Sequence, residues 1–314
     1  MAQGVIGVQV AGADAPALLR AIEDAEKLGI PAVWTTSEGV DSLTLFPAAA
    51  VRTSRILLGT AIVRAATRHP VSMAQQAAVV GQLAPGRLRL GVGPVNPNQA
   101  GIYGPGPTRP LAHLRAYIGA VKSLLETGLV DVDKDGVVAH ARLPGAPVEV
   151  PVMASALRRA SFALCGAVAD GAITWICPAS YVEKVALPAL RSAALTAQRP
   201  SPPLIMHVPV ALSTDAAAVR ALLRERYAFY LRVANYVAMF ADAGFPEAKE
   251  GQWSDDMIDS VAIYGTETAV ADRLLSLLDG TASELLVSPL GVGEHGAAAT
   301  SHVFRFIGEL AGHA

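Results

Sequence analysis

Small residues and two arginines stand together in one short stretch of this chain, and their chemistry suits an anion. Ser155 is a good N-cap for a helix beginning near Ala156, and it follows a predicted strand at 148–153. A strand end, a small-residue turn and a helix N-terminus together form a typical anion site. The arginines could pair with a phosphate, or they could be surface residues beside a degraded site. The candidate contacts are Ala154, Ser155, Ala156, Leu157, Arg158 and Arg159.

Other candidate side chains follow predicted strands. Glu38 comes after the strand at 32–36, and it could act as a general acid if burial raised its pKa; the alternative is a solvated loop glutamate. Trp175, near the end of the strand at 171–176, could pack against a ligand or fill the core. Glu294 and His295 lie in the loop GVGEHG after the last strand, where they are candidate substrate contacts.

The histidines and cysteines do not indicate a metal site. His69, His207 and His295 lack HxxxH or HExxH spacing, and Cys165 and Cys177 are too few for a zinc site or a disulfide framework. We expect His207, inside a strand, to be a hydrogen-bonded barrel residue rather than a base. We therefore propose no metal, and the cysteine count favours a reducing cytoplasm.

Eight predicted strands alternate with helices, and the strands must position these residues. This alternation predicts an α/β fold, a (β/α)₈ TIM barrel with insertions, in a single domain over residues 1–314. An open doubly wound sheet is the alternative, but no GxGxxG follows the first strand. The predicted strands are 5–10, 32–36, 56–63, 87–92, 148–153, 171–176, 204–212 and 284–288.

The stretch from Ile56 to Gly93 is the most informative part of the chain. It predicts a strand, a helix opened by Pro70 and a second strand, which is a βαβ unit with parallel strands. The other predicted helices are 14–28, 43–52, 111–126, 156–168, 182–197, 215–243 (bent or split), 266–278 and 297–310. We also expect a hairpin at 130–143 turning at Asp135-Gly136, an irregular segment at 244–259 and a short extended piece at 260–264.

Composition narrows the function. The chain has 314 residues, 52% hydrophobic and 17% charged, with a net charge of -2. The low charged fraction favours strands buried on both faces, as in parallel sheets. Near-neutral charge gives no footprint for nucleic acid or an anionic membrane, and we expect a soluble protein without a membrane span.

The segment LGTAIVRAATRHPVSMAQQAAVVGQLAPGRLRLGVG resembles the signature of the luciferase-like monooxygenase family. AIEDAEKLGIPAVWTTSE is similar to the family's first helix and second strand, and RRASFALCGAVADGAI to the part that follows its phosphate-binding turn. RYAFYLRVANYVAMFADAGF and IYGTETAVADRLLSLLDGTASELLVSP are like the C-terminal portion of the subgroup that uses coenzyme F420.

The resemblance implies a cofactor, FMN or F420, at the C-terminal ends of the strands. It implies a non-prolyl cis peptide at Ala61-Ile62 beneath the ring, whereas the residues alone fit an ordinary buried strand end. Val63, Gly93 and Pro94 are further expected cofactor contacts. Relatives often carry histidine at the position of Glu38, a catalytic glutamate at that of Asn96, and Gly-Pro where Arg158-Arg159 stand, so any inherited mechanism is altered here.

Three functions are open. The first is hydride transfer between F420 and a C=C, C=N or C=O bond of a small organic substrate, with Glu38 and Asn96 as catalytic candidates. The second is an FMN-dependent monooxygenase served by a separate flavin reductase; the third is a family member that has lost cofactor use. The resemblance also implies a homodimer. We expect the loop at 93–110 and the insertion at 244–262 to select the substrate.

Overall fold

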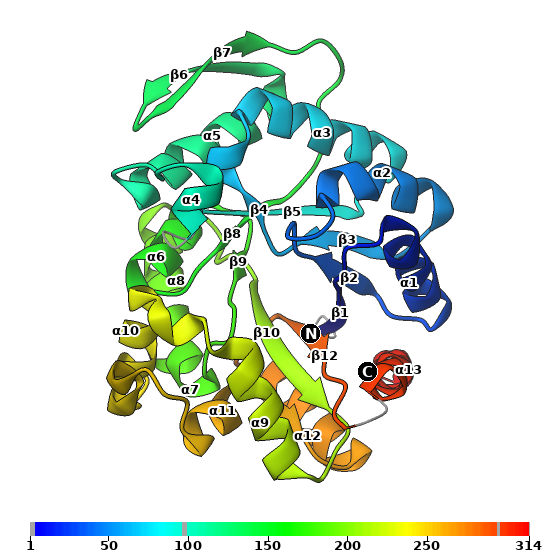
Figure 1. Cartoon of the computed structure of the whole chain (residues 1–314). Helices are drawn as coiled ribbons and strands as arrows, with labels where there is room; N and C mark the ends of the chain where they lie inside the picture. Colours follow the sequence, from blue (N-terminus) through cyan, green and yellow to red (C-terminus); the bar gives the residue numbers. More distant parts are fainter. Residues whose placement is uncertain (1–3, 96–98, 294–295, 314) are drawn as a thin grey trace.

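Eight parallel strands close into a barrel in the computed structural model, which describes residues 4–95, 99–293 and 296–313 (Figure 1). The order around the barrel is β1-β2-β3-β5-β8-β9-β10-β12, and β12 pairs with β1. The barrel strands are β1 Val5–Val10, β2 Ala32–Thr35, β3 Leu57–Thr60, β5 Leu88–Gly93, β8 Val152–Ser155, β9 Ala172–Ile173, β10 Leu204–Ala211 and β12 Glu284–Pro289. The predicted (β/α)₈ barrel is confirmed, and the open sheet is excluded.

Two short strands extend the barrel sheet. β4, Val63–Arg64, continues β3 after a break of two residues and pairs with β5. β11, Ile263–Tyr264, pairs with the outer end of β10 and matches the extended piece expected at 260–264. The predicted hairpin is confirmed outside the barrel, as β6 Leu129–Lys134 and β7 Val137–Arg142 joined through Asp135-Gly136.

Helices cover the outer face of the barrel, as Figure 1 shows. They are α1 Ala15–Lys27, α2 Ser42–Arg52, α3 Pro70–Leu83, α4 Ala100–Tyr103, α5 Pro110–Thr127, α6 Arg159–Val168, α7 Ala179–Tyr181, α8 Leu187–Thr196, α9 Ala216–Tyr227, α10 Ala234–Asp242, α11 Asp255–Val261, α12 Glu267–Leu278 and α13 Gly296–His313. Shorter helical turns are η1 Ala65–Thr67, η3 Val182–Ala186, η4 Tyr230–Arg232 and η5 Pro246–Glu250. The helix expected at 215–243 is split into α9, η4 and α10.

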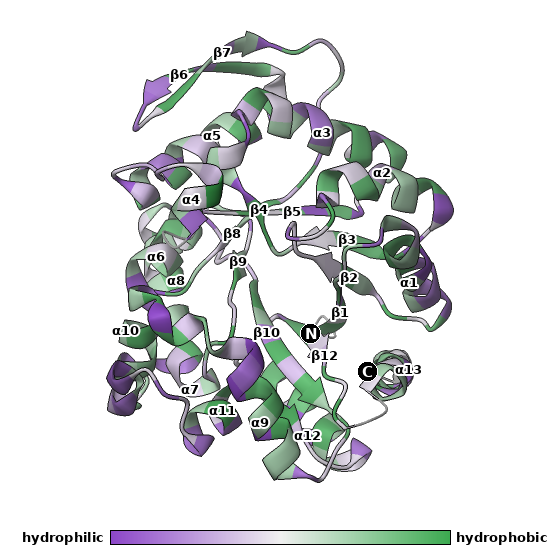
Figure 2. Ribbon diagram, in the orientation of Figure 1, coloured by the Kyte–Doolittle hydropathy of each residue, from purple (hydrophilic) through white to green (hydrophobic). Residues whose placement is uncertain are grey.

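The strands are apolar because both of their faces are buried. Every residue of β5 and of β10 is buried, and β10 is largely hydrophobic in Figure 2. Successive side chains of a strand point to opposite faces, so alternate residues face the barrel interior. Trp34, Ile173, Ile205 and Leu286 meet there in one small apolar cluster, separate from the large core between strands and helices.

Several predicted boundaries are wrong. The strand expected at 148–153 begins at Val152, because the main chain joins the β5 ladder only from there. The helix expected from Ala156 begins at Arg159, and β8 runs through Ser155. A helix was expected at 182–197, but helical structure begins earlier, at Ala179, and contains a π turn. The segment at 244–259 is not irregular, since η5 and most of α11 lie in it.

Candidate active site

A cavity of about 610 Å³ opens at the C-terminal ends of the barrel strands. This volume lies within the usual range for a site that binds a small molecule or cofactor. Its lining includes five residues expected from the sequence, Glu38, Ala61, Ile62, Pro94 and Trp175, together with Ser155 of the predicted anion site. The other lining residues are Gln9, Ala11, Thr36, Ser37, Arg64, Gln99, Ile173, Thr174, Arg226, Tyr227, Phe229, Tyr230 and Tyr236.

The break between β3 and β4 forms one wall of the cavity. The peptide bond between Ala61 and Ile62 is cis, which confirms the expectation for this strand end. The neighbouring strand β5 must have glycine at position 91, since a Cβ there would lie 2.0 Å from the Thr60 carbonyl oxygen. A Cβ on Gly93 would lie 2.4 Å from Ser155 Oγ. Glycine at both positions therefore lets β3, β5 and β8 approach closely behind the cavity.

Val63 does not reach this cavity. It is fully buried in β4, where it pairs with Val92. Gly93 does not line the cavity either, and it acts by giving Ser155 room. Both residues therefore support the wall of the site, and neither presents a side chain to a ligand.

The turn at 154–159 differs from the predicted anion site. Ser155 lines the cavity from the end of β8, but it does not cap α6. Instead the Ser161 hydroxyl accepts hydrogen bonds from the main-chain N–H groups of Leu157 and Arg158, at 3.0 Å each. The expected N-cap is wrong because β8 continues through Ser155 and α6 begins only at Arg159, with Arg158 in the N-cap position.

The two arginines of this turn have different surroundings. Arg158 pairs with Asp242 of α10 at 3.0 Å, while its Nη1 is buried without a hydrogen-bond partner among the described residues. Arg159 is exposed on the surface of α6. Of the two, only Arg158 therefore keeps a buried donor without a partner in the described part of the chain, and like Leu157 and Arg159 it does not line the cavity. Ala154 and Ala156 are buried in the core and do not line the cavity.

Glu38 lies at the rim of the cavity. Its side chain is 69% exposed, and its carboxylate accepts from Arg64 Nη2 at 3.4 Å. The burial that the general-acid hypothesis invokes is therefore absent. Arg64 is the buried partner: it also donates to the Ser37 carbonyl oxygen at 3.0 Å, and its guanidinium lies 4.8 Å from the Tyr103 ring centroid. Sequence reasoning missed Arg64, which resembles an ordinary strand-end residue.

His207 is fully buried beneath the cavity, as expected for a barrel histidine. Its Nδ1 accepts from the main-chain N–H of Ile176 at 3.2 Å, and its Nε2 lies 2.7 Å from Ser288 Oγ. Burial, with a smaller effect of the Arg226 charge, lowers the pKa of His207 to about 3. The Trp175 indole stacks on the imidazole at 3.7 Å between ring centroids. Trp175 therefore packs on His207 and also lines the cavity, and its contact with a ligand stays a prediction.

Aromatic residues and one arginine from α9, η4 and α10 complete the lining. Tyr227, Phe229, Tyr230 and Tyr236 come from this part of the chain, together with Arg226. Burial, with a smaller effect of the negative charge of Glu38, raises the pKa of Tyr230 to about 12, so the hydroxyl stays protonated near neutral pH. None of these lining residues was predicted, because the sequence does not show which residues of a split helix face the barrel.

The floor of the barrel is closed by a buried ion pair. Arg89 of β5 and Glu284 of β12 form a bidentate ion pair, in which Arg89 Nη2 donates to Glu284 Oε1 at 2.9 Å. Trp34 Nε1 donates to the same carboxylate at 2.8 Å. The Arg89 guanidinium lies 4.3 Å from the Trp34 ring centroid. These side chains fill the end of the barrel opposite the cavity.

Three sequence-predicted site residues, Asn96, Glu294 and His295, lie outside the described residues. Within the described part of the chain, no group of three His, Cys, Asp or Glu side chains could hold a metal ion. None of the described helices combines the length and apolar character of a membrane-spanning segment.

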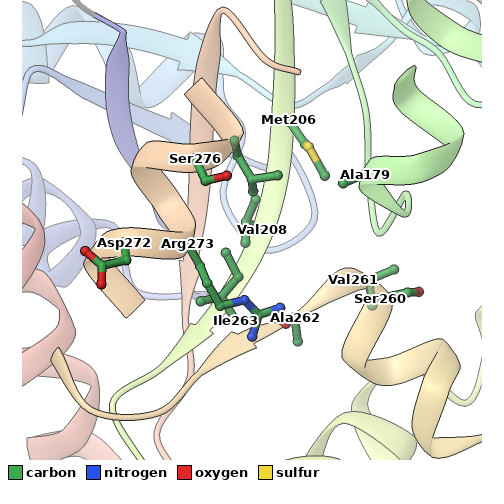
Figure 3. Close-up of a pocket in the computed structure, with 11 residues that line it drawn as sticks. Ala179, Met206, Val208, Ser260, Val261, Ala262, Ile263, Asp272, Arg273 and Ser276 are labelled. Atoms are coloured by element: carbon green, nitrogen blue, oxygen red, sulfur yellow. Dashed lines mark hydrogen bonds between the residues drawn. The ribbon is translucent and has the colours of Figure 1, made fainter. Parts of the chain in front are cut away.

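A second cavity, of about 290 Å³, lies outside the barrel wall (Figure 3). Met206 and Val208 line it from β10, and Arg273 lines it from α12. The two β10 residues alternate with the inward-facing Ile205 and His207, so this cavity is separated from the first by the sheet. Arg273 donates to the Ala262 carbonyl oxygen at 3.3 Å. Because no predicted site residue lies there, the inner cavity is the candidate active site.

Known proteins resemble this chain in sequence and in fold. A sequence model described as "Luciferase-like monooxygenase" matches residues 3–284. An F420-dependent glucose-6-phosphate dehydrogenase from Beutenbergia cavernae is 33% identical over 190 residues, and the match covers 57% of this chain but only 55% of the relative.

Two solved structures share the fold over nearly their whole length. An F420-dependent secondary alcohol dehydrogenase in complex with an F420-acetone adduct superimposes with a TM-score of 0.80 at 18% identity, covering 98% of each chain. The coenzyme F420-dependent tetrahydromethanopterin reductase from Methanopyrus kandleri gives a TM-score of 0.77 at 20% identity, also covering 98% of each chain. At these identities the likeness concerns the fold alone.

Proposed function

Because this chain belongs to the luciferase-like monooxygenase family, we propose that it is an oxidoreductase that binds coenzyme F420 in the cavity at the C-terminal ends of its strands. The observation that carries the proposal is the cavity itself, backed by the cis peptide at Ala61-Ile62. The choice of F420 is supported by the curated relative from Beutenbergia cavernae, which is named as an F420-dependent enzyme.

The residues of the cavity fit such a cofactor. Ala61 and Ile173 are buried members of one apolar cluster, and Ile62 and Trp175 pack against it, so a planar ring has a flat apolar surface to rest on. A phosphate needs hydrogen-bond donors, and the Ser155 hydroxyl lines the cavity from the end of β8. Arg158, whose buried Nη1 has no partner among the described residues, lies outside this lining. Arg226 adds a positive charge to the opposite wall.

The cofactor would supply the chemistry, by giving or accepting a hydride, and the protein supplies orientation and electrostatics. Reduction of a C=O, C=N or C=C bond also requires a proton on the second atom. Glu38 lies at the solvent-exposed rim, so its carboxylate can pass a proton between water and the site. Tyr230 keeps its proton and can donate a hydrogen bond from the facing wall.

Titration of the purified protein with oxidised F420 and, separately, with FMN tests the proposal. We expect micromolar affinity for F420 and no binding of FMN. The variant Ala61→Phe, which fills the cavity, should abolish F420 binding, whereas Ala66→Phe, on an exposed position nearby, should not. Circular dichroism checks that both variants fold.

The reverse result, FMN binding without F420 binding, would instead support a monooxygenase that receives electrons from a separate flavin reductase. Binding of neither cofactor by the folded wild-type protein would indicate a family member that has lost cofactor use. A small organic substrate and a homodimer remain predictions.

A further inference from the structure

A chain of hydrogen bonds crosses the inner face of the barrel directly beneath the cavity. It begins at the main-chain N–H of Ile176, after β9, and passes through His207 of β10 and Ser288 of β12 to Gln9 of β1. These strands are consecutive in the barrel, in the order β9-β10-β12-β1. The chain therefore links four neighbouring strands and ends at a residue that lines the cavity.

The direction of each hydrogen bond follows from the first. Because Ile176 N–H donates to His207 Nδ1, that nitrogen carries no proton. A neutral imidazole must then carry its proton on Nε2, and burial keeps the pKa of His207 far below neutrality. Nε2–H donates to Ser288 Oγ across 2.7 Å. Because Oγ accepts this hydrogen bond, the serine hydroxyl donates its own proton to a different acceptor. It donates to Gln9 Oε1.

Gln9 is thereby fixed in one orientation. An amide group has one acceptor oxygen and an NH₂ group with two donors. With Oε1 held by Ser288, the NH₂ group is turned away from the chain, and it makes no hydrogen bond to any described residue. It is the end of the chain that faces the cavity, where the apolar floor of Ala61, Ile173 and Trp175 offers no competing acceptor side chain.

We infer that Gln9 is a cofactor-binding residue whose amide N–H donates to a carbonyl oxygen on the planar ring bound in the cavity, and that His207 and Ser288 are positioning residues for it. The inference rests on the proposed function. The ring is the partner because it would rest on the apolar floor of the cavity, and Gln9 is a partly buried lining residue, whereas Glu38, Arg226 and Phe229 are exposed. FMN and F420 rings both carry such carbonyls.

The affinity of matched variants for F420 tests whether the Gln9 amide donates a hydrogen bond to the ring. Gln9→Met keeps the length but removes the donor and should raise the Kd for F420 about 5-fold, the value of one hydrogen bond. Gln9→Glu places a carboxylate against the carbonyl and should raise the Kd at least about 10-fold. Ser288→Ala keeps the Gln9 amide but removes the hydroxyl that holds its orientation, so we expect a smaller rise in the Kd, of about 2- to 3-fold. Gln82→Met, the same substitution on the exposed surface of α3, should leave the Kd unchanged.

The orientation of the chain has its own test in the wild-type protein without cofactor. In ¹⁵N-histidine-labelled protein, His207 should show the neutral tautomer with its proton on Nε2 at every pH from 8 down to 5. Ser288→Ala should shift the Nε2 resonance and leave the tautomer unchanged. A proton on Nδ1 would overturn the inference, because the chain would then run in the opposite direction.

The remaining outcomes are equally decisive. If F420 binds to the wild type but Gln9→Met and Gln9→Glu bind it equally well, the donor role is wrong while the proposed function stands. If only FMN binds, the same Kd changes measured with FMN would support Gln9 and overturn the choice of cofactor. A folded protein that binds neither ring overturns both proposals.

Discussion

Burial shifts the pKa values of two residues around this cavity in opposite directions. His207 is held neutral, because its pKa falls to about 3, and Tyr230 is held protonated, because its pKa rises to about 12. Both can therefore act as hydrogen-bonding groups of constant polarity across the physiological range. Glu38 is the contrasting case, a side chain at the solvent-exposed rim that pairs with Arg64.

The lowered pKa of His207 predicts that the protein loses stability on acidification. The unfolded chain binds a proton at this residue near pH 6.5, whereas the native protein does so only near pH 3. Stability from this residue is complete above pH 6.5 and is lost progressively as the pH falls toward 3. Between pH 7.5 and 5.0 we expect a loss of about 2 kcal/mol in the free energy of unfolding.

The variant His207→Gln isolates this effect, because glutamine does not titrate. Urea denaturation of both proteins at pH 7.5 and 5.0 gives two losses of stability, and the wild type should lose about 2 kcal/mol more than the variant. The variant will be less stable at both pH values, but that offset cancels in the comparison. Equal losses would show that His207 is accessible to protons in the native state.

At this scale, residue type and neighbourhood in the sequence predicted only part of the site. The cis peptide at Ala61-Ile62 and the cavity residues Glu38, Pro94 and Trp175 follow from strand ends and the family resemblance. The partnership of Gln9 with Ser288 does not, because the two are 279 residues apart and meet only through barrel closure. Each alone is an ordinary polar residue in an apolar strand.

Among the elements, β3 shows how a single glycine shapes the barrel. A Cβ on Gly59 would lie 2.3 Å from the Trp34 ring, which cannot retreat because its Nε1 is bonded to Glu284 and Arg89 packs on its face. Gly59→Ala should therefore destabilise the protein by about 1–3 kcal/mol, the usual cost of overpacking a core.

Gly119→Ala is the matched substitution, in the exposed part of α5. Nothing lies within 4 Å of its added Cβ, so the change should stabilise the helix by about 0.5–1 kcal/mol through backbone entropy alone. Urea midpoints of the two variants should move in opposite directions from the wild type. A Gly59→Ala midpoint at or above the wild-type value would mean that β3 and Trp34 repack freely.

The existence of the elements was more predictable than their ends. The eight barrel strands are mostly apolar because helices and the barrel interior bury both faces, and this pattern is visible in the sequence. The ends of β8 and β9 depend on which neighbours complete the ladder, so β9 pairs over only Ala172–Ile173 within an apolar stretch of six residues. α11 was not predicted, because a helix of seven residues is too short to show a repeating helical pattern of apolar residues in the sequence.

Across the whole molecule, the insertion between β10 and β11 is part of the barrel's core rather than an appendage. One buried cluster contains Ile22 of α1 and also Phe240 and Met257 of the insertion. Arg220 of α9 binds Asp255 and Asp259 of α11, at 2.9 and 3.0 Å. Since the insertion also supplies one wall of the cavity, its folding and ligand binding should be linked.

This continuity predicts that the chain unfolds as one cooperative unit, as a single domain should. Trp34 reports on the barrel floor, and Trp253 reports on the insertion, where its Nε1 donates to the Tyr227 carbonyl oxygen at 3.0 Å. Two variants each keep one of these reporters, Trp175→Phe/Trp253→Phe and Trp34→Phe/Trp175→Phe. In each variant, the urea midpoint from tryptophan fluorescence should coincide with that from far-ultraviolet circular dichroism. A Trp253 midpoint at lower urea than the circular dichroism midpoint would instead define the insertion as a separate unit that opens before the barrel.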